Sequence, residues 1–211
     1  MKITSVTPIV VDQAELERRR ERYARLCPPG VEFALDPLPP HGPRQLATAA
    51  DIAASTALVT AALDAQPAGP GLVRMPDCVL DPGVPAEPAG DTVGPVGMLR
   101  IAAAHLAARG ERFGAVTRNP AIAAALAKRV HDYGLDAWFA GVTVLDLELD
   151  AVADAGRWHR AVRGALDDFA ARGVGTVVNG CSAVDPGPAH RVRLVDPAAL
   201  ALSLLAAGAA L

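Results

Sequence analysis

The chain has 211 residues, enough for one substantial domain or two small lobes, and 51% of them are hydrophobic, so a sizeable core can form. Its net charge is −3, from 20 Lys and Arg against 23 Asp and Glu, which leaves no positive excess to bind a phosphate backbone. Only 4% of the residues are aromatic, so few side chains can stack on bases. The composition therefore argues against nucleic acid as a partner.

The ends of the sequence and its cysteines indicate a cytoplasmic protein. The start, Met1-Lys2-Ile3, enters an apolar run without the features of a secretory signal. The most apolar segment, 197–211, spans 15 residues, fewer than the roughly 20 needed to cross a bilayer, so we expect a buried helix and no membrane association. The three cysteines form no CxxC pair or zinc-type cluster, so we expect reduced thiols and no metal.

The first half of the chain alternates between short apolar runs and helical patterns. The sequence predicts strands at 3–11, 31–35 and 71–75, helices at 13–25, 48–65 and 98–108, and Pro/Gly-rich loops at 36–43 and 81–95. Thr48 or Asp51 is expected to cap the second helix.

The second half continues the alternation. It predicts strands at 112–117, 140–146 and 175–179, and helices at 120–133 and 154–172 that end before Gly134 and Gly173. Strands that alternate with helices favour parallel sheets built from βαβ units.

Two stretches of the sequence repeat each other. CVLDPG at 78–83 and CSAVDPG at 181–187 each follow an apolar strand, and 103 positions separate Cys78 from Cys181. A second echo relates SVTP, which contains Val6, to AVTRNP, which contains Val116, at an offset of 110. The two offsets predict a duplicated lobe with one cysteine at the carboxyl end of a strand in each half, the end at which ligands bind in open α/β sheets.

Simpler explanations exist for these residues. A cysteine beside an apolar strand is commonly a small buried hydrophobic residue, and we interpret Cys27, before Pro28-Pro29, in this way. Asp-Pro-Gly strings also form ordinary turns. The pairing of both features at matching positions of the two halves favours a functional role for Cys78 and Cys181.

At these residues the sequence resembles the aspartate/glutamate racemase superfamily, and within it the hydantoin racemases. CVLDPG at 78–83 is similar to their Cys-x-x-Asp-Pro-Gly stretch, and VNGC at 178–181 resembles their second cysteine motif. The strand at 112–117 is similar to a middle strand that ends in Thr, and Gly42-Pro43 resembles a Gly-Pro before the second helix.

The resemblance implies an α/β fold of two pseudo-symmetric Rossmann-like lobes, each a short parallel sheet flanked by helices, with the active site between them. The expected lobes are 1–95, completed by a C-terminal helix at 197–211, and 96–196. The resemblance also implies no cofactor, a small carbonyl or carboxylate substrate, and a homodimer.

In the chemistry implied by the resemblance, Cys78 and Cys181 are the acid/base pair. One thiolate removes a proton from a carbon next to a carbonyl, and the opposite thiol returns one to the other face. The expected substrate contacts include Thr7 and the N–H groups of Val79, Thr117, Arg118 and Ser182, which would bind the developing oxyanion. We expect such donors also to lower the thiol pKa.

Three features depart from the family pattern. Thr7-Pro8-Ile9 stands where hydantoin racemases have Asn-Pro-Asn, which affects substrate contacts there. The loop at 37–44 also differs, and its His41 and Arg44 either contact a carboxylate or lie in solvent. Asp77 precedes Cys78, and its charge would disfavour a thiolate, so we expect its side chain to point away.

Three classes of function follow from these patterns. The first is a cofactor-independent racemase or epimerase. The second is an enzyme similar to maleate isomerase or arylmalonate decarboxylase, in which one cysteine acts on a single face, or an isomerase of a biosynthetic pathway. The third is a non-catalytic binding protein that retains the fold.

Overall fold

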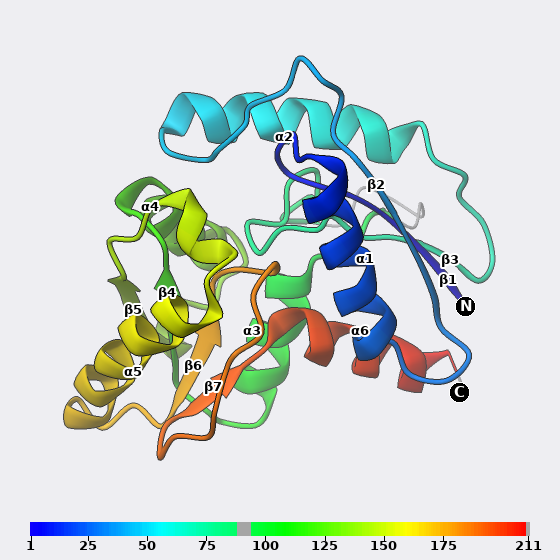
Figure 1. Ribbon diagram of the computed structural model, residues 1–211. Coiled ribbons are helices and arrows are strands. Elements are labelled where there is room, and N and C mark those ends of the chain that lie inside the picture. Colours follow the sequence, from blue (N-terminus) through cyan, green and yellow to red (C-terminus); the bar gives the residue numbers. More distant parts are fainter. Residues whose placement is uncertain (88–93, 210–211) are drawn as a thin grey trace.

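The computed structural model describes residues 1–87 and 94–209, and within them two separate parallel sheets form the centres of two lobes (Figure 1). The first sheet has the order β2-β1-β3, and its strands are β1 (Lys2–Val6), β2 (Glu32–Asp36) and β3 (Leu72–Arg74). The second has the order β5-β4-β6-β7, with β4 (Phe113–Thr117), β5 (Phe139–Val144), β6 (Thr176–Asn179) and β7 (Arg193–Val195). The predicted fold of two Rossmann-like lobes is confirmed.

Helices flank both sheets. They are α1 (Gln13–Leu26), α2 (Ala49–Asp64), α3 (Met98–Ala108), α4 (Pro120–Asp132), α5 (Ala155–Ala171) and α6 (Pro197–Gly208), with short 3-10 helices η1 (Asp136–Trp138) and η2 (Leu149–Val152). Side chains satisfy several helix starts: Thr48 and Asp51 form a capping box on α2, and Asn119 caps α4. No helix in the described part of the chain is long and apolar enough to span a bilayer.

The two lobes share one topology at their centres. In each sheet the first strand of the lobe lies between the second and the third. Beyond β3 the Asp77 N–H donates to the Val6 carbonyl at 3.1 Å, and beyond β6 the Gly180 N–H donates to the Val116 carbonyl at 2.8 Å. Asp77 and Gly180 are therefore equivalent positions, and the residues after them are the two repeat cysteines.

The last helix packs against the first lobe. Ala198, Ala201 and Leu202 of α6 belong to one buried cluster with Ile3 of β1 and Met98 of α3, and Figure 1 shows α6 beside α3 and α1. The boundary expected at 95/96 adjoins residues 88–93, which lie outside the described residues, as do 210–211 of the predicted terminal helix. The lobe boundaries therefore stay a prediction.

Two elements differ from the sequence prediction. The strand expected at 3–11 ends at Val6, because the Thr7 hydroxyl donates to the Ile9 carbonyl at 2.8 Å and accepts from the Leu38 N–H at 2.9 Å, which turns the chain. The sequence also gave no indication of β7. This strand is three residues long and starts with the exposed Arg193, so it depends on pairing with β6 rather than on its own pattern.

Candidate active site

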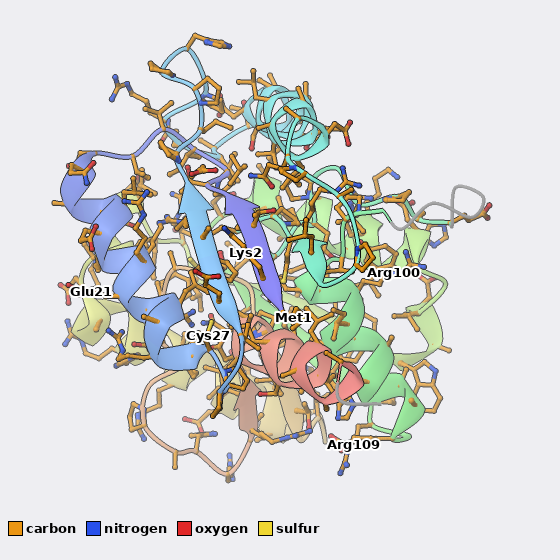
Figure 2. The ribbon with its side chains drawn as sticks, turned by 90° about the vertical axis from the view of Figure 1, so that its right-hand side faces the viewer. Met1, Lys2, Glu21, Cys27, Arg100 and Arg109 are labelled. Carbon is orange, nitrogen blue, oxygen red and sulfur yellow. The ribbon has the colours of Figure 1, made fainter. Side chains whose placement is uncertain are left out.

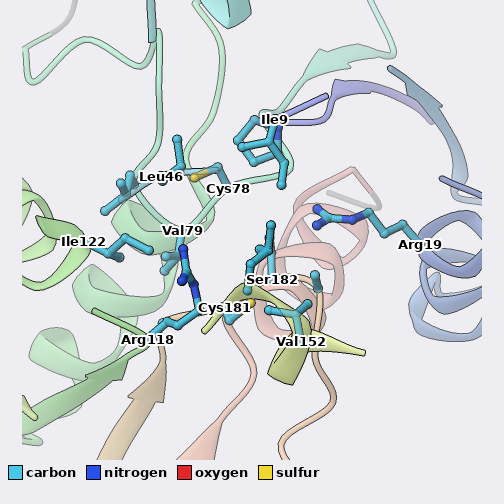
Figure 3. Close-up of a pocket in the computed structure, with 15 residues that line it drawn as sticks. Ile9, Arg19, Leu46, Cys78, Val79, Arg118, Ile122, Val152, Cys181 and Ser182 are labelled. Carbon is cyan, nitrogen blue, oxygen red and sulfur yellow. The ribbon is translucent and has the colours of Figure 1, made fainter. Parts of the chain in front are cut away.

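A cavity lies between the two lobes, next to the carboxyl ends of β1, β3, β4 and β6 (Figure 3). It encloses about 550 Å³, including its open mouth, and most of its wall is aliphatic. It is lined by Pro8, Ile9, Arg19, Leu46, Cys78, Val79, Leu80, Arg118, Ile122, Leu149, Val152, Gly180, Cys181, Ser182 and Ala183. The position and size of this cavity are typical of a small-molecule site.

The two repeat cysteines line this cavity from opposite lobes (Figure 3). Cys78 follows β3 and is buried, whereas Cys181 follows β6 and is half-buried. Their loops touch, because the Ser182 hydroxyl donates to the Asp77 carbonyl at 3.1 Å. Cys27, at the end of α1 (Figure 2), packs against a different cluster and is not part of the cavity wall. All three cysteines are free.

Gly180 allows Cys181 to reach the cavity. A Cβ atom on Gly180 would stand 2.6 Å from Cγ2 of Thr117 and closer still to the Val116 carbonyl oxygen. Only a residue without a side chain can make this close approach to β4 and keep the hydrogen bond to Val116. The Gly-Cys pair of the second motif thus has a steric cause.

The Cys78 loop (78–84) is fixed by a buried carboxylate. Oδ1 of Asp81 accepts from the Leu99 N–H at 3.1 Å, and Oδ2 accepts from the Arg100 N–H at 2.9 Å and the Tyr133 hydroxyl at 2.9 Å. Asp81 therefore caps the first turn of α3, which follows 17 positions later in the chain. Burial raises the pKa of Asp81 to about 6, although these donors and Arg129 oppose the shift.

An arginine from the second lobe also holds the Cys78 loop. Arg129 of α4 donates to the carbonyls of Leu80 at 3.1 Å, Asp81 at 2.9 Å and Val84 at 3.2 Å. One guanidinium thus satisfies three carbonyls of a loop that belongs to the other lobe, and it fixes the path of the chain around Cys78.

The Cys181 loop (181–187) is held in the corresponding way by α1 of the first lobe. Arg18 donates to the Ala183 carbonyl at 2.9 Å, and Arg22 donates to the Val184 carbonyl at 3.3 Å. Arg22 also lies 3.0 Å from Asp185, which is otherwise exposed. In each lobe the helix that follows the central strand, α1 after β1 or α4 after β4, therefore supplies arginine side chains that hold the cysteine loop of the other lobe: Arg18 and Arg22 in one case and Arg129 in the other. The four-residue spacing of Arg18 and Arg22 was the available sequence signal.

Asp77 points away from the cavity, as expected. Its carboxylate is fully buried, where it accepts from Nη1 of Arg19 at 2.8 Å and from the Tyr23 hydroxyl at 2.6 Å. Nε of Arg19 donates to Glu15 at 2.7 Å. Arg19 also lines the cavity, and sequence analysis missed it because it lies within a charged helical run.

Burial raises the pKa of both cavity-lining thiols, contrary to the lowering expected from backbone donors. The pKa of Cys78 rises to about 12, chiefly through burial, with the Leu80 N–H opposing the shift and the negative charges of Asp77 and Asp81 adding to it. Burial also raises the pKa of Cys181, while the Ala183 N–H and the cationic Arg19 lower it. The N–H donors are thus present, but desolvation outweighs them.

The structure brings some of the predicted substrate contacts to the cavity and not others. Val79, Arg118 and Ser182 line it together with the two cysteines. Thr7 and Thr117 lie behind the wall: the Thr7 hydroxyl serves the turn after β1, and that of Thr117 donates to the Asn119 carbonyl at 3.4 Å.

Other residues of the cavity wall are ones for which no role was predicted, and two predicted candidates are not part of the wall. His41 and Arg44, in the loop at 37–44 that departs from the family pattern, are exposed and do not line the cavity. Leu149 and Val152 of η2 do line it, although no sequence pattern marked that segment. Within the described chain, no three His, Cys, Asp or Glu side chains are grouped so that they could hold a metal ion.

Comparisons with known proteins give matches among solved structures only, since no family model and no curated protein matches the chain. Allantoin racemase from Klebsiella pneumoniae has a TM-score of 0.77 and 22% identity, over 100% of this chain and 88% of that one. Allantoin racemase from Pseudomonas fluorescens has a TM-score of 0.80 and 19% identity, over 98% and 90%.

A more distant match extends the comparison. An aspartate racemase homologue from Pyrococcus horikoshii has a TM-score of 0.58 and 14% identity, over 100% of this chain and 99% of that one. At such identities the likeness concerns the fold. The chain therefore shares its fold with these racemases, in agreement with the two-lobed α/β fold that the sequence resemblance implies.

Proposed function

We propose that the protein is a cofactor-independent racemase or epimerase in which Cys78 and Cys181 exchange a proton with a carbon next to a carbonyl. One observation carries this proposal: two cysteines at equivalent positions of two pseudo-symmetric lobes line the same cavity. The fold shared with allantoin and aspartate racemases supports it. The free thiols fit a reducing compartment such as the cytoplasm.

The proposed reaction has two proton transfers. The Cys181 thiolate removes the proton from the substrate carbon, and the electron pair of the C–H bond moves onto the carbonyl oxygen to give an enolate. The Cys78 thiol then donates its proton to the opposite face of that carbon. Cys181 ends as a thiol and Cys78 as a thiolate, and the other enantiomer reacts through the reverse sequence.

The surroundings of the two thiols favour Cys181 as the base in the first proton transfer. Burial raises the pKa of both thiols, but Arg19 opposes the rise at Cys181 whereas Asp77 and Asp81 add to it at Cys78, so we assign the first proton abstraction to Cys181. A thiolate with a raised pKa is also a stronger base, which suits removal of a proton from carbon. The N–H groups of Val79, Arg118 and Ser182 are the proposed donors to the enolate oxygen.

The test follows exchange of the α-hydrogen with D2O by NMR. The probes are single enantiomers of 5-isopropylhydantoin, aspartate and the monomethyl ester of isopropylmalonic acid, a chiral monoanion with an acidic C–H bond. Wild type is expected to exchange and racemise at least one of them, and Cys78→Ser and Cys181→Ser are each expected to abolish racemisation. Cys27→Ser is the matched control and should retain the wild-type rate.

Other outcomes would contradict the two-base scheme. The unequal surroundings of the two thiols also fit an enzyme that acts on one face, similar to arylmalonate decarboxylase, whose Gly74Cys variant shares the fold with a TM-score of 0.52. Loss of activity in only one Cys→Ser variant would favour that function. Absence of exchange in wild type with all three probes would favour a binding protein.

A further inference from the structure

Two guanidinium groups, those of Arg19 and Arg118, lie in an otherwise uncharged cavity wall. Arg19 reaches it from α1 of the first lobe, and Arg118 follows β4 of the second. In the view of Figure 3 they extend toward the space around the cysteines from different sides. Among the described residues that line the cavity there is no Asp or Glu.

The two arginines differ in how their charge is balanced. Arg19 pairs with Glu15 at 2.7 Å and with Asp77 at 2.8 Å, so its charge is neutralised within the protein. Arg118 is 6% exposed, and no carboxylate of the described chain lies within ion-pair distance of it. Its guanidinium donates one hydrogen bond within the described chain, from Nη1 to the Leu147 carbonyl at 3.2 Å.

An unbalanced buried cation is costly, and a bound anion would remove that cost. Hydrogen bonding to Leu147 uses one N–H of the guanidinium and leaves donors available in the planar arrangement that suits a carboxylate. The start of α4 lies beside the guanidinium of Arg118. Asn119 directly follows Arg118 and caps α4, and Ile122 in the first turn of α4 lines the cavity. The positive end of the helix dipole adds to the attraction for an anion.

We infer that the cavity binds a carbon acid that carries one carboxylate on an aliphatic body and no ammonium group, and that Arg118 holds the carboxylate. The described residues of the wall offer no carboxylate to pair with an ammonium, which separates this substrate class from α-amino acids. The unpaired guanidinium separates it from neutral hydantoins. The inference rests on the proposed function only in treating the bound molecule as a substrate.

The test uses three unreactive probes with one carbon skeleton: 3-methylbutanoate, 3-methylbutanamide and valine. Binding is measured by NMR titration of the protein. 3-Methylbutanoate is expected to bind about 10- to 100-fold more tightly than 3-methylbutanamide or valine, which is the range for hydrogen bonds to a charged partner. Arg118→Gln should abolish the preference over the amide, and Arg118→Lys should retain part of that preference because the charge remains.

Arg112 is exposed and directly precedes the first residue of β4. Arg112→Gln is therefore the matched control and should behave as wild type. Equal binding of the three probes, no measurable binding of the carboxylate at tens of millimolar, or a preference that persists in a folded Arg118→Gln protein would overturn the inference. Thermal unfolding of the variant establishes that it is folded.

The double variant Cys78→Ser, Cys181→Ser separates this inference from the proposed function. It should keep the preference for the carboxylate while exchange is lost. If wild type prefers the carboxylate but catalyses no exchange, the racemase proposal fails and the assignment of Arg118 stands. If exchange occurs without any preference for the carboxylate, the assignment of Arg118 fails and the racemase proposal stands.

Discussion

The Cys78 loop and the Cys181 loop leave equivalent strands at equivalent positions, yet they are stabilised in different ways. In the first, the aspartate of the Asp-Pro-Gly string is fully buried and caps α3. In the second, the corresponding Asp185 is exposed and pairs with Arg22 of the other lobe. The repeated motif thus keeps the cysteine just after the strand end, while the aspartate acquires a new partner. The same divergence gives the two thiols different electrostatic surroundings.

The largest expected effect concerns the glycine that only the second loop needs. Gly180→Ala places a Cβ against the Val116 carbonyl and Thr117 Cγ2, so the chain before Cys181 must shift. We expect about a 100-fold loss of exchange activity, as for a misplaced catalytic group, and about 1–3 kcal/mol of destabilisation. Gly175→Ala at the other end of β6 meets no atom within 4 Å and should change stability by less than about 0.5 kcal/mol. Equal behaviour of the two variants would contradict the steric role of Gly180.

The second test compares the two aspartates of the repeat. Asp81→Ala leaves the N–H groups of Leu99 and Arg100 without their acceptor, so we expect a loss of about 2–3 kcal/mol in urea unfolding. Asp185→Ala removes a largely exposed partner, and Arg22 keeps Asp196, so the loss should stay below about 1 kcal/mol. Similar losses of stability in both variants would mean that the two aspartates contribute equally to the stability of the fold.

The smallest expected effect concerns the reactivity of the two thiols. Thiolate is the reactive form, and although burial raises the pKa of both thiols, Arg19 opposes the rise at Cys181 while Asp77 and Asp81 add to it at Cys78. Iodoacetamide should therefore modify Cys181 about 10-fold faster than Cys78 at pH 8, as followed by peptide mass spectrometry. Loss of the cation raises a thiol pKa, so Arg19→Met should move the pH profile of Cys181 modification to higher pH.

Arg20→Met is the control for that experiment, because Arg20 is on the same helix but donates to the Leu35 carbonyl. It should leave the profile unchanged. If Arg19→Met also left it unchanged, access rather than charge would explain the difference between the thiols.

Much of the fold was predictable because its signals are local. The apolar run before Gly110 predicted α3 with the bounds that the structure shows, and Thr48 caps α2 as expected. The similar offsets of the two echoes also placed Cys78 and Cys181 at equivalent strand ends, since both lobes follow the same order of strands and helices. That both cysteines reach one cavity agrees with the predicted pairing.

The contacts between lobes were not predictable in the same way. Arg18 and Ala183 are 165 positions apart, and the helical pattern around Arg18 and Arg19 is also that of a solvated charged face. The pKa values of the thiols depend on how much solvent the two lobes jointly exclude, which no local pattern encodes. The charge on Arg118 stands out only in the structure, where no carboxylate among the described residues forms an ion pair with it.

The packing of α6 links the order of synthesis to the order of folding. As the ribosome extends the chain, residues 1–87 emerge first, but the cluster around Ile3 and Met98 lacks Ala198, Ala201 and Leu202 until α6 is made. Until α6 is made, the apolar surface of this cluster that α6 covers has no partner helix. The lobe that is translated first completes its core last.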